Sequence, residues 1–224
     1  MVTVCPDLQY ERQVGDYIIR CAQKELQPEI TEFVAQIYYH QAGFKFNLSY
    51  AELAGRMLEE DHCLQDYSTV YTVYDSGRRI LGTVRVVILR DNLELPVQRE
   101  FEIDLEKVVS DRYPVGNVIE MGRLAIRGNS IGIIKLLFIE AMAGFEENDM
   151  LLAAIDFQVL RRLNRLGFPF ERIGEPRYYR GSFTCPVAQS VREIKRAFGL
   201  NYNREAALRP KDLRSLRAVE RGNG

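Results

Sequence analysis

The stretch from residue 117 to residue 167 limits the possible folds most, because its hydrophobic period changes repeatedly. Residues 117–127 ("NVIEMGRLAIR") and 150–156 ("MLLAAID") are short apolar runs, which predict two buried strands. The pattern becomes helical from Ile131 and again over residues 157–167. A strand–helix–strand–helix order predicts a sheet with a crossover connection, so the expected fold class is α/β.

Helices and an antiparallel strand pair are expected ahead of this stretch. Residues 28–44 place apolar side chains on one helical face, and Ser49 followed by Glu52 predicts a second, capped helix to about residue 60. Residues 68–75 and 80–90 are typical of two strands joined by the turn "SGRR". The other expectations are a mixed strand or helix pattern over 1–26, a short strand or turn over 99–106, strand-like segments over 170–174 and 177–185, and helices near 187–198 and 204–220.

Composition narrows the classes of function. The chain has 30 basic and 31 acidic residues, so its overall charge gives no reason to expect nucleic acid as a partner. Four scattered cysteines and two histidines form no zinc-like cluster, which predicts neither a metal site nor a disulfide framework and favours the cytoplasm. No apolar run approaches about 20 residues, so no stable membrane insertion is expected. We expect one domain over residues 1–198 and a basic, helical C-terminal tail over 199–224.

The loop between the strand at 117–127 and the following helix has two interpretations. Unpaired backbone N–H groups at a helix N-terminus attract anions, Gly128 and Gly132 allow close approach of a ligand, and Arg127 adds a positive charge. The alternative is an ordinary turn in which Asn129 or Ser130 caps the helix. Both interpretations stay open on the loop residues alone.

The same loop carries a family resemblance. Arg127-x-x-Ser130-x-Gly132 resembles the loop of GNAT acyltransferases that holds the pyrophosphate and pantetheine of an acyl carrier, with Ser130 in place of the first motif glycine. The segment "LLAAIDFQVLRRLNRLGF" is similar to the fifth strand and following helix of that fold. This resemblance implies a GNAT-like mixed, twisted sheet flanked by helices. Ordinary members have a tyrosine general acid where this chain has Asn164, which leaves Tyr178 or Tyr179 as substitutes.

A closer resemblance covers roughly residues 30–195. The strand Gly82-x-x-Arg85, the strand Glu120-x-x-Arg123 and the acidic segment "DHCLQDYSTVY" resemble motifs of the N-acyl amino acid synthases and the acyl-homoserine-lactone (autoinducer) synthases. In the acidic segment, Asp61 and Asp66 are the candidate matches. The absence of tryptophan and the reading "MGRL" favour the amino-acid branch.

The resemblance implies an N-acyltransferase that moves a long acyl chain from acyl carrier protein or acyl-CoA to the amine of an amino acid, without a metal. The candidate residues are Glu120 and Arg123 for catalysis; Leu124, Ile126, Arg127, Gly128, Asn129, Ser130, Ile131 and Gly132 for the carrier; and Arg85, Asp66, Phe33, Tyr38, Phe44, Phe168 and Tyr178 for the substrates.

Several roles have a second interpretation. Glu120 is either the general base, with its pKa raised by apolar neighbours, or one half of a structural ion pair with Arg85 or Arg123. The two arginines could instead bind the acceptor's carboxylate.

At the level of function, the alternatives are a homoserine-lactone synthase and a non-catalytic acyl-carrier-binding protein. An acidic carrier protein would need a basic docking patch, for which the candidates are Arg161, Arg162 and Arg165 or the segment 192–221.

Overall fold

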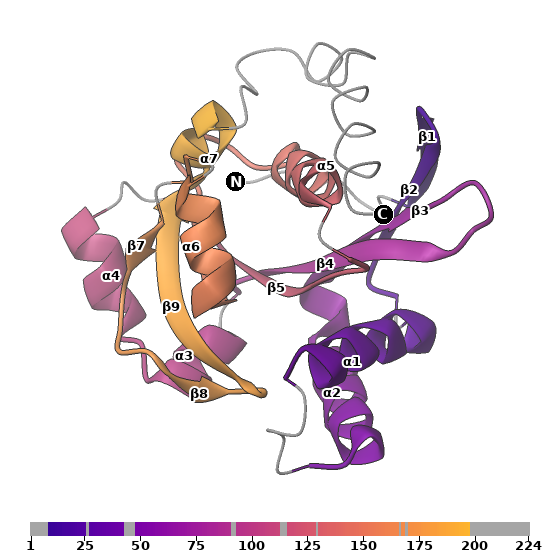
Figure 1. Ribbon diagram of the computed structural model, residues 1–224. Helices are drawn as coiled ribbons and strands as arrows, with labels where there is room; N and C mark the ends of the chain where they lie inside the picture. Colours follow the sequence, from indigo (N-terminus) through magenta and orange to yellow (C-terminus); the bar gives the residue numbers. More distant parts are fainter. Residues whose placement is uncertain are drawn as a thin grey trace.

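The structure is a computed structural model that describes residues 9–25, 27–42, 48–90, 93–112, 116–128, 130–165, 167–168 and 170–197. These residues form a nine-stranded mixed sheet with helices on both faces (Figure 1). The strands are β1 (Tyr10–Val14), β2 (Tyr17–Gln23), β3 (Ser68–Tyr74), β4 (Ile80–Ile88), β5 (Val118–Ile126), β6 (Met150–Asp156), β7 (Glu171–Arg172), β8 (Arg177–Tyr179) and β9 (Ser182–Ser190). The helices are α1 (Pro28–Ala42), α2 (Tyr50–Leu64), the short 3-10 helix η2 (Gln65–Tyr67), α3 (Pro96–Phe101), α4 (Leu105–Arg112), α5 (Ile131–Met142), α6 (Phe157–Arg165) and α7 (Val191–Ala197).

The strands run in the order β1-β2-β3-β4-β5-β6-β9-β7, and β8 pairs with β9. All neighbouring strands are antiparallel except β5 and β6, which are parallel because α5 crosses between them. The α/β class and the crossover predicted from the sequence are therefore confirmed. The central sheet lies between α5 on one side and α1 and α2 on the other (Figure 1).

Local sequence explains most of these elements. The predicted cap of α2 is confirmed as a capping box, because the Ser49 hydroxyl accepts from the Glu52 backbone N–H while the Glu52 carboxylate accepts from the Ser49 N–H. The helix runs to Leu64, four residues beyond the expected end. The hairpin of β3 and β4 is confirmed. The mixed pattern of residues 1–26 corresponds, where described, to the hairpin of β1 and β2.

The prediction of a strand or turn over residues 99–106 was wrong about the strand. Phe101, Ile103 and Leu105 alternate like a buried strand, but they belong to the end of α3, a connecting turn and the start of α4. Pro96 occupies the first turn of α3, where its missing N–H is not needed, and the Gln98 side chain accepts from the Leu95 N–H. These helix-start features decide the local structure over the alternation.

Two boundaries near the C-terminal end also differ from expectation. Residues 187–190 belong to β9, which pairs with the whole of β6, so the helix expected from 187 begins only at Val191. The Ser190 hydroxyl accepts from the Glu193 N–H and so caps α7. The helix expected over 204–220, and the tail 199–224, lie outside the described residues.

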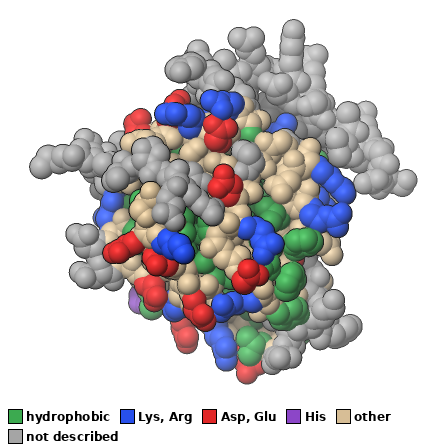
Figure 2. All heavy atoms as spheres, turned by 90° about the vertical axis from the view of Figure 1, so that its left-hand side faces the viewer, with side chains coloured by type: hydrophobic (Ala, Val, Ile, Leu, Met, Phe, Trp, Pro, Cys, Tyr) green, Lys and Arg blue, Asp and Glu red, His purple; other side chains and the backbone are tan. Residues whose placement is uncertain are grey.

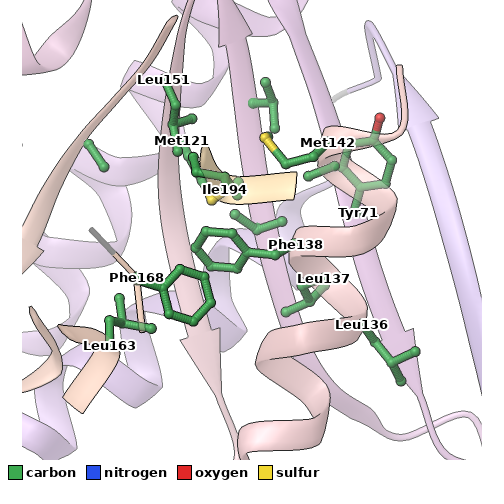
Figure 3. Close-up of a cluster of buried hydrophobic side chains, with 14 of the residues drawn as sticks. Tyr71, Met121, Leu136, Leu137, Phe138, Met142, Leu151, Leu163, Phe168 and Ile194 are labelled. Atoms are coloured by element: carbon green, nitrogen blue, oxygen red, sulfur yellow. The ribbon is translucent and has the colours of Figure 1, made fainter. Parts of the chain in front are cut away.

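The core is divided by the sheet. On the α5 face, aromatic and aliphatic side chains form the cluster that Figure 3 shows, in which Phe168 lies between Phe138 and Leu163. On the opposite face, one group packs under α3 and another under α1 and α2. Gly82 explains how closely α5 approaches β4, since a Cβ there would lie 2.6 Å from Ile133 Cγ2.

Candidate active site

The site begins where β5 and β6 separate. The two strands pair only between Val118–Glu120 and Met150–Leu152, whereas β6 continues along β9 as far as Asp156. A cavity of about 620 Å³ fills the opening and is lined by the diverging parts of both strands. Because the strands no longer pair there, their facing backbone N–H and C=O groups are available to a ligand with amide groups.

A bulge in β5 shapes this opening. Arg85 of β4 pairs with Gly122 and Thr83 pairs with Ala125, so two steps on β4 match three on β5. The extra residue lies beside Arg123, whose φ of +57° is in the left-handed region. In a regular strand, side chains three residues apart lie on opposite faces. The bulge instead brings Glu120 and Arg123 to the same face, towards α2 and α3.

Two carboxylates at the end of α2 hold the buried arginines. Asp61 accepts from Arg85 and from Arg123 Nε (3.0 Å), and it also accepts from the Thr31 hydroxyl at 2.7 Å. Glu60 Oε1 accepts from Arg85 (3.0 Å) and from Arg123 (3.1 Å). Burial lowers the pKa of Arg123, but Asp61 and Glu60 outweigh it and leave this pKa above its ordinary value. The structural interpretation of the two arginines therefore accounts for their contacts.

The ion pairs of Arg85 and Arg123 go to Glu60 and Asp61 rather than to Glu120. Its side chain is buried, and its Oε2 accepts from the Val97 N–H of α3 at 2.9 Å. Burial raises the pKa of Glu120 from 4.5 to about 7, although the Val97 hydrogen bond and the Arg85 charge act in the opposite direction. A carboxyl group with such a pKa exchanges protons near neutral pH, which suits a general base.

The cavity has a polar end and an apolar end. The polar end, on the α2 and α3 side, carries Glu120, Glu60 and Arg180. The apolar end lies on the α5 side and is lined by side chains such as Met121, Phe138 and Leu151. These three belong to the hydrophobic cluster of Figure 3. The arrangement can hold a molecule whose reactive group is polar and whose tail is a hydrocarbon.

The loop after β5 lies beyond the cavity lining. Ser130 is the N-cap of α5, and its hydroxyl accepts from the Ile133 N–H at 3.4 Å, as the turn interpretation expects. Gly128 has a φ of +75°, and a Cβ there would meet nothing within 4 Å. The Arg127 guanidinium donates to the Ile80 carbonyl and lies 5.5 Å from the centre of the Phe33 ring. Leu124 lines the cavity, whereas Ile126, Ile131 and Gly132 do not, and Asn129 lies outside the described residues.

The expected substrate residues other than Arg85 lie in different places. Tyr38 and Tyr178 line the cavity, and Tyr38 donates to the Leu124 carbonyl at 3.3 Å. Phe33 and Phe168 are buried core residues outside the lining, although Phe168 packs against Phe138 with 5.6 Å between ring centres. Asp66 is an exposed residue of η2 away from the cavity. Phe44 lies outside the described residues.

At the polar end, Glu60 and Arg180 were not among the residues named from the sequence, and Tyr179 was named only as a substitute general acid. Glu60 directly precedes the recognised Asp61, so the run of acidic residues at the end of α2 was the available indication. Tyr179 lies beside the cavity, and burial raises its pKa, with the Glu60 charge acting in the same direction. Arg180 contacts Glu60 from the β8–β9 turn. Asn164 is exposed on α6 and does not line the cavity.

Two further findings concern the described residues alone. They contain no group of three or more His, Cys, Asp or Glu side chains placed to hold a metal ion. None of their helices combines the length and apolarity that a membrane span requires.

On the face shown in Figure 2, acidic and basic side chains are interspersed, and hydrophobic side chains gather towards its right edge.

Comparison with known proteins adds an independent line of evidence. A profile described as N-acyl amino acid synthase FeeM matches residues 30–189. The solved structure of FeeM, an N-acyl amino acid synthase from uncultured soil microbes, is 14% identical with a TM-score of 0.55, over 84% of this chain and 96% of that one. No curated protein matches the chain in sequence.

Two other solved structures are also similar. TofI in a ternary complex with an inhibitor and MTA is 16% identical with a TM-score of 0.54, over 81% of this chain and 91% of that one. BjaI, a CoA-dependent acyl-homoserine lactone synthase with SAM and isopentyl-CoA, is 13% identical with a TM-score of 0.52, over 80% and 87%. At these identities the likeness concerns the fold alone, and it supports the mixed sheet flanked by helices that the sequence predicts.

Proposed function

The chain belongs to the N-acyl amino acid synthase FeeM family and is an acyltransferase, and from this premise we propose that it transfers a long acyl chain from a thioester carrier to the α-amine of an amino acid. The observation that carries the proposal is the cavity between β5 and β6, with Glu120 at its polar end and an apolar end under α5. The cavity thus offers separate places for a reacting amine and for a hydrocarbon chain.

The donor fits the opening through its arm and its acyl chain. The unpaired edges of β5 and β6 can hydrogen-bond the amide groups of a pantetheine arm, as an added strand would. The start of α5 and Gly128 would then receive phosphate where β5 ends at Ile126, six residues and about 20 Å from Glu120. The acyl chain would lie in the apolar end, where each buried methylene contributes about 0.8 kcal/mol.

The chemistry follows from these positions. The acceptor's amine nitrogen attacks the thioester carbonyl, the new C–N bond forms, and the C–S bond breaks to release a thiolate, which takes a proton from solvent to become the thiol. Glu120 accepts the proton that the amine loses, directly or through a water. Tyr179 stays protonated because its pKa is raised, so its hydroxyl is suited to donate a hydrogen bond to the developing oxyanion. Tyr178 is 56% exposed and less suited to that role.

We also propose acyl carrier protein as a donor, alongside acyl-CoA. Such carriers are acidic, and the outer face of α6 carries Arg161 and Arg165, both exposed. Arg162 lines the cavity and could reach the carrier's phosphate. Reversing the charges of Arg161 and Arg165 should raise KM for acyl carrier protein and leave KM for acyl-CoA unchanged. Unchanged kinetics with the carrier protein would remove α6 as the docking surface.

We also propose that the enzyme is located in the cytoplasm. Cys21 and Cys185 are buried free thiols and Cys63 is an exposed one, as expected in a reducing compartment. The proposed function is tested by incubating the purified protein with acyl-CoA or acyl carrier protein and a mixture of amino acids. Mass spectrometry should detect N-acyl amino acids, whereas an acyl-homoserine lactone formed only with SAM present would identify a lactone synthase.

A further inference from the structure

The two buried arginines that the sequence offered as an alternative site for the acceptor's carboxylate are already paired. Arg85 and Arg123 are 4% and 7% exposed, and both donate to Asp61 and Glu60 on α2. Arg123 also donates to the Met57 carbonyl at 3.1 Å. Arg85 Nε lacks a hydrogen-bond partner but is fully buried, so a substrate carboxylate could reach the outer nitrogens of either guanidinium only by displacing a buried ion pair, which is strongly unfavourable. The acceptor therefore needs another cation.

Arg180 supplies such a cation at the mouth of the polar end. It lines the cavity, its side chain is 19% exposed, and it donates to Glu60 Oε2, the oxygen of Glu60 that does not face the buried arginines. Its guanidinium lies over the Tyr179 ring, 5.0 Å from the ring centre. Arg99 of α3 approaches the same Glu60 oxygen at 3.7 Å, and its side chain is 50% exposed. Two accessible guanidinium groups thus converge on one point.

The charges at this point do not balance without a ligand. Arg85, Arg123 and Arg180 carry three positive charges against the two negative charges of Glu60 and Asp61, which leaves one positive charge, while Arg99 pairs with its neighbour Glu100 at 2.9 Å. Burial holds Glu120 partly protonated near neutral pH, so it does not fully supply the missing negative charge. One carboxylate from a bound molecule would complete the balance.

The backbone of Arg180 gives a second indication. β8 and β9 are joined by Arg180 and Gly181, and both have positive φ, +47° and +83°. Such two-residue turns favour Asn-Gly, and an arginine in this conformation is disfavoured by its Cβ. Strained residues of this kind cluster at functional sites, although Arg78 in the β3–β4 turn also has a positive φ. The turn fixes the direction of the Arg180 side chain over the cavity.

We propose that Arg180, with Arg99 beside it, binds the α-carboxylate of the amino-acid acceptor. This inference rests on the proposed function and names the acceptor's binding site within it. The acceptor's carboxylate takes the place near Arg180 and Arg99 that Glu60 Oε2 holds in the free protein. The acceptor's amine, which is joined to the carboxylate through the α-carbon, projects into the cavity lined by Glu120. The enzyme then selects α-amino acids over amines that lack a carboxylate.

The test compares two acceptors that differ only in the carboxylate. The first is the amino acid that the wild-type enzyme acylates fastest among the twenty, and the second is the amine left when its carboxylate is removed. KM and kcat are measured for both, with palmitoyl-CoA as donor, in the wild type and in Arg180→Met, Arg180→Lys and Arg172→Met. Arg172 is a matched control, because it is a half-exposed arginine on β7 that pairs with Glu175.

In Arg180→Met, KM for the amino acid should rise about 10- to 100-fold, the effect of losing a charge-assisted hydrogen bond, and KM for the amine should stay within about twofold. Arg180→Lys should recover part of the loss, and Arg172→Met should match the wild type. Equal effects on both acceptors, no effect on either, or a wild type that accepts the amine as well as the amino acid would overturn the inference while leaving acyl transfer in place. A wild type that acylates neither acceptor would overturn the proposed function and this inference with it.

Discussion

Glu120 and Arg123 lie three residues apart on β5, yet both side chains lie on the same face of the sheet. Glu120 reaches the Val97 N–H of α3, and Arg123 reaches Asp61 and Glu60 of α2. The bulge opposite Thr83 and Arg85 makes this possible, since it shifts the alternation of β5 by one residue. A carboxylate and its electrostatic environment are thereby assembled from a single strand at the edge of the cavity.

The first prediction concerns the chemistry of Glu120. Replacing Glu120→Gln should lower kcat by about 10²- to 10⁴-fold, because the amide cannot accept the amine's proton. The fold should persist, since the amide oxygen can still accept from the Val97 N–H. With a saturating acyl donor, the rate of the wild type should rise with pH around 7, the pKa of Glu120, and that rise should be missing in the variant. Turnover near the wild-type level would exclude Glu120 as the base.

The same substitution should change how stability depends on pH. The pKa of Glu120 is about 7 in the folded protein and 4.5 ordinarily, so the folded state favours the protonated form. Its stabilising contribution is complete below about pH 4.5 and is lost as the pH rises through 7. Relative to the wild type, Glu120→Gln should therefore be about equally stable at pH 4 and more stable at pH 8, by on the order of 3 kcal/mol. Urea unfolding at the two pH values measures the difference, and a constant difference would contradict it.

The sequence predicted the elements well where local rules act alone. The capping box of Ser49 and Glu52 and the run of β-branched residues in β3 needed no tertiary information. Glu120, Arg123 and Arg85 were recognisable as a group, but the bulge that places the first two on one face depends on pairing with β4. Asp66 was chosen from the acidic segment on resemblance alone, although Asp61 makes the ion pairs, because three-dimensional contact decides between neighbouring acids.

The second prediction compares these two aspartates. Asp61→Asn removes a negative charge that pairs with the buried arginines Arg85 and Arg123. The free energy of unfolding should therefore fall by about 3–5 kcal/mol. Asp66→Asn changes an exposed residue of η2 and should alter it by less than about 0.5 kcal/mol. Urea unfolding of the two variants gives both values. Similar small effects would show that the ion pairs contribute little to stability.

The third prediction concerns the contribution of Gly82, in the Gly82-x-x-Arg85 motif, to the stability of the fold. Gly82→Ala should destabilise the fold by about 1–3 kcal/mol, because the new Cβ would lie 2.6 Å from Ile133 Cγ2 and press α5 away from β4. Gly55→Ala is the control: Gly55 is on α2 with nothing within 4 Å of a new Cβ, so the change should stabilise by about 0.5–1 kcal/mol. Opposite signs in thermal unfolding support the packing argument, and a stabilised Gly82→Ala would refute it.

The last prediction concerns the length of the acyl chain. Phe138 lines the apolar end of the cavity, and Phe168 packs directly behind it without reaching the lining (Figure 3). Phe138→Leu should enlarge that end and shift the preferred acyl-CoA towards longer chains, because each further methylene that is buried there contributes about 0.8 kcal/mol. The shift is measured as kcat/KM across a series of acyl-CoA donors of increasing chain length. Phe168→Leu should lose similar stability, since both rings are buried in one cluster, but keep the wild-type preference. If both variants shift the preference equally, general loosening of the core is the cause. If neither does, the acyl chain lies elsewhere than under α5.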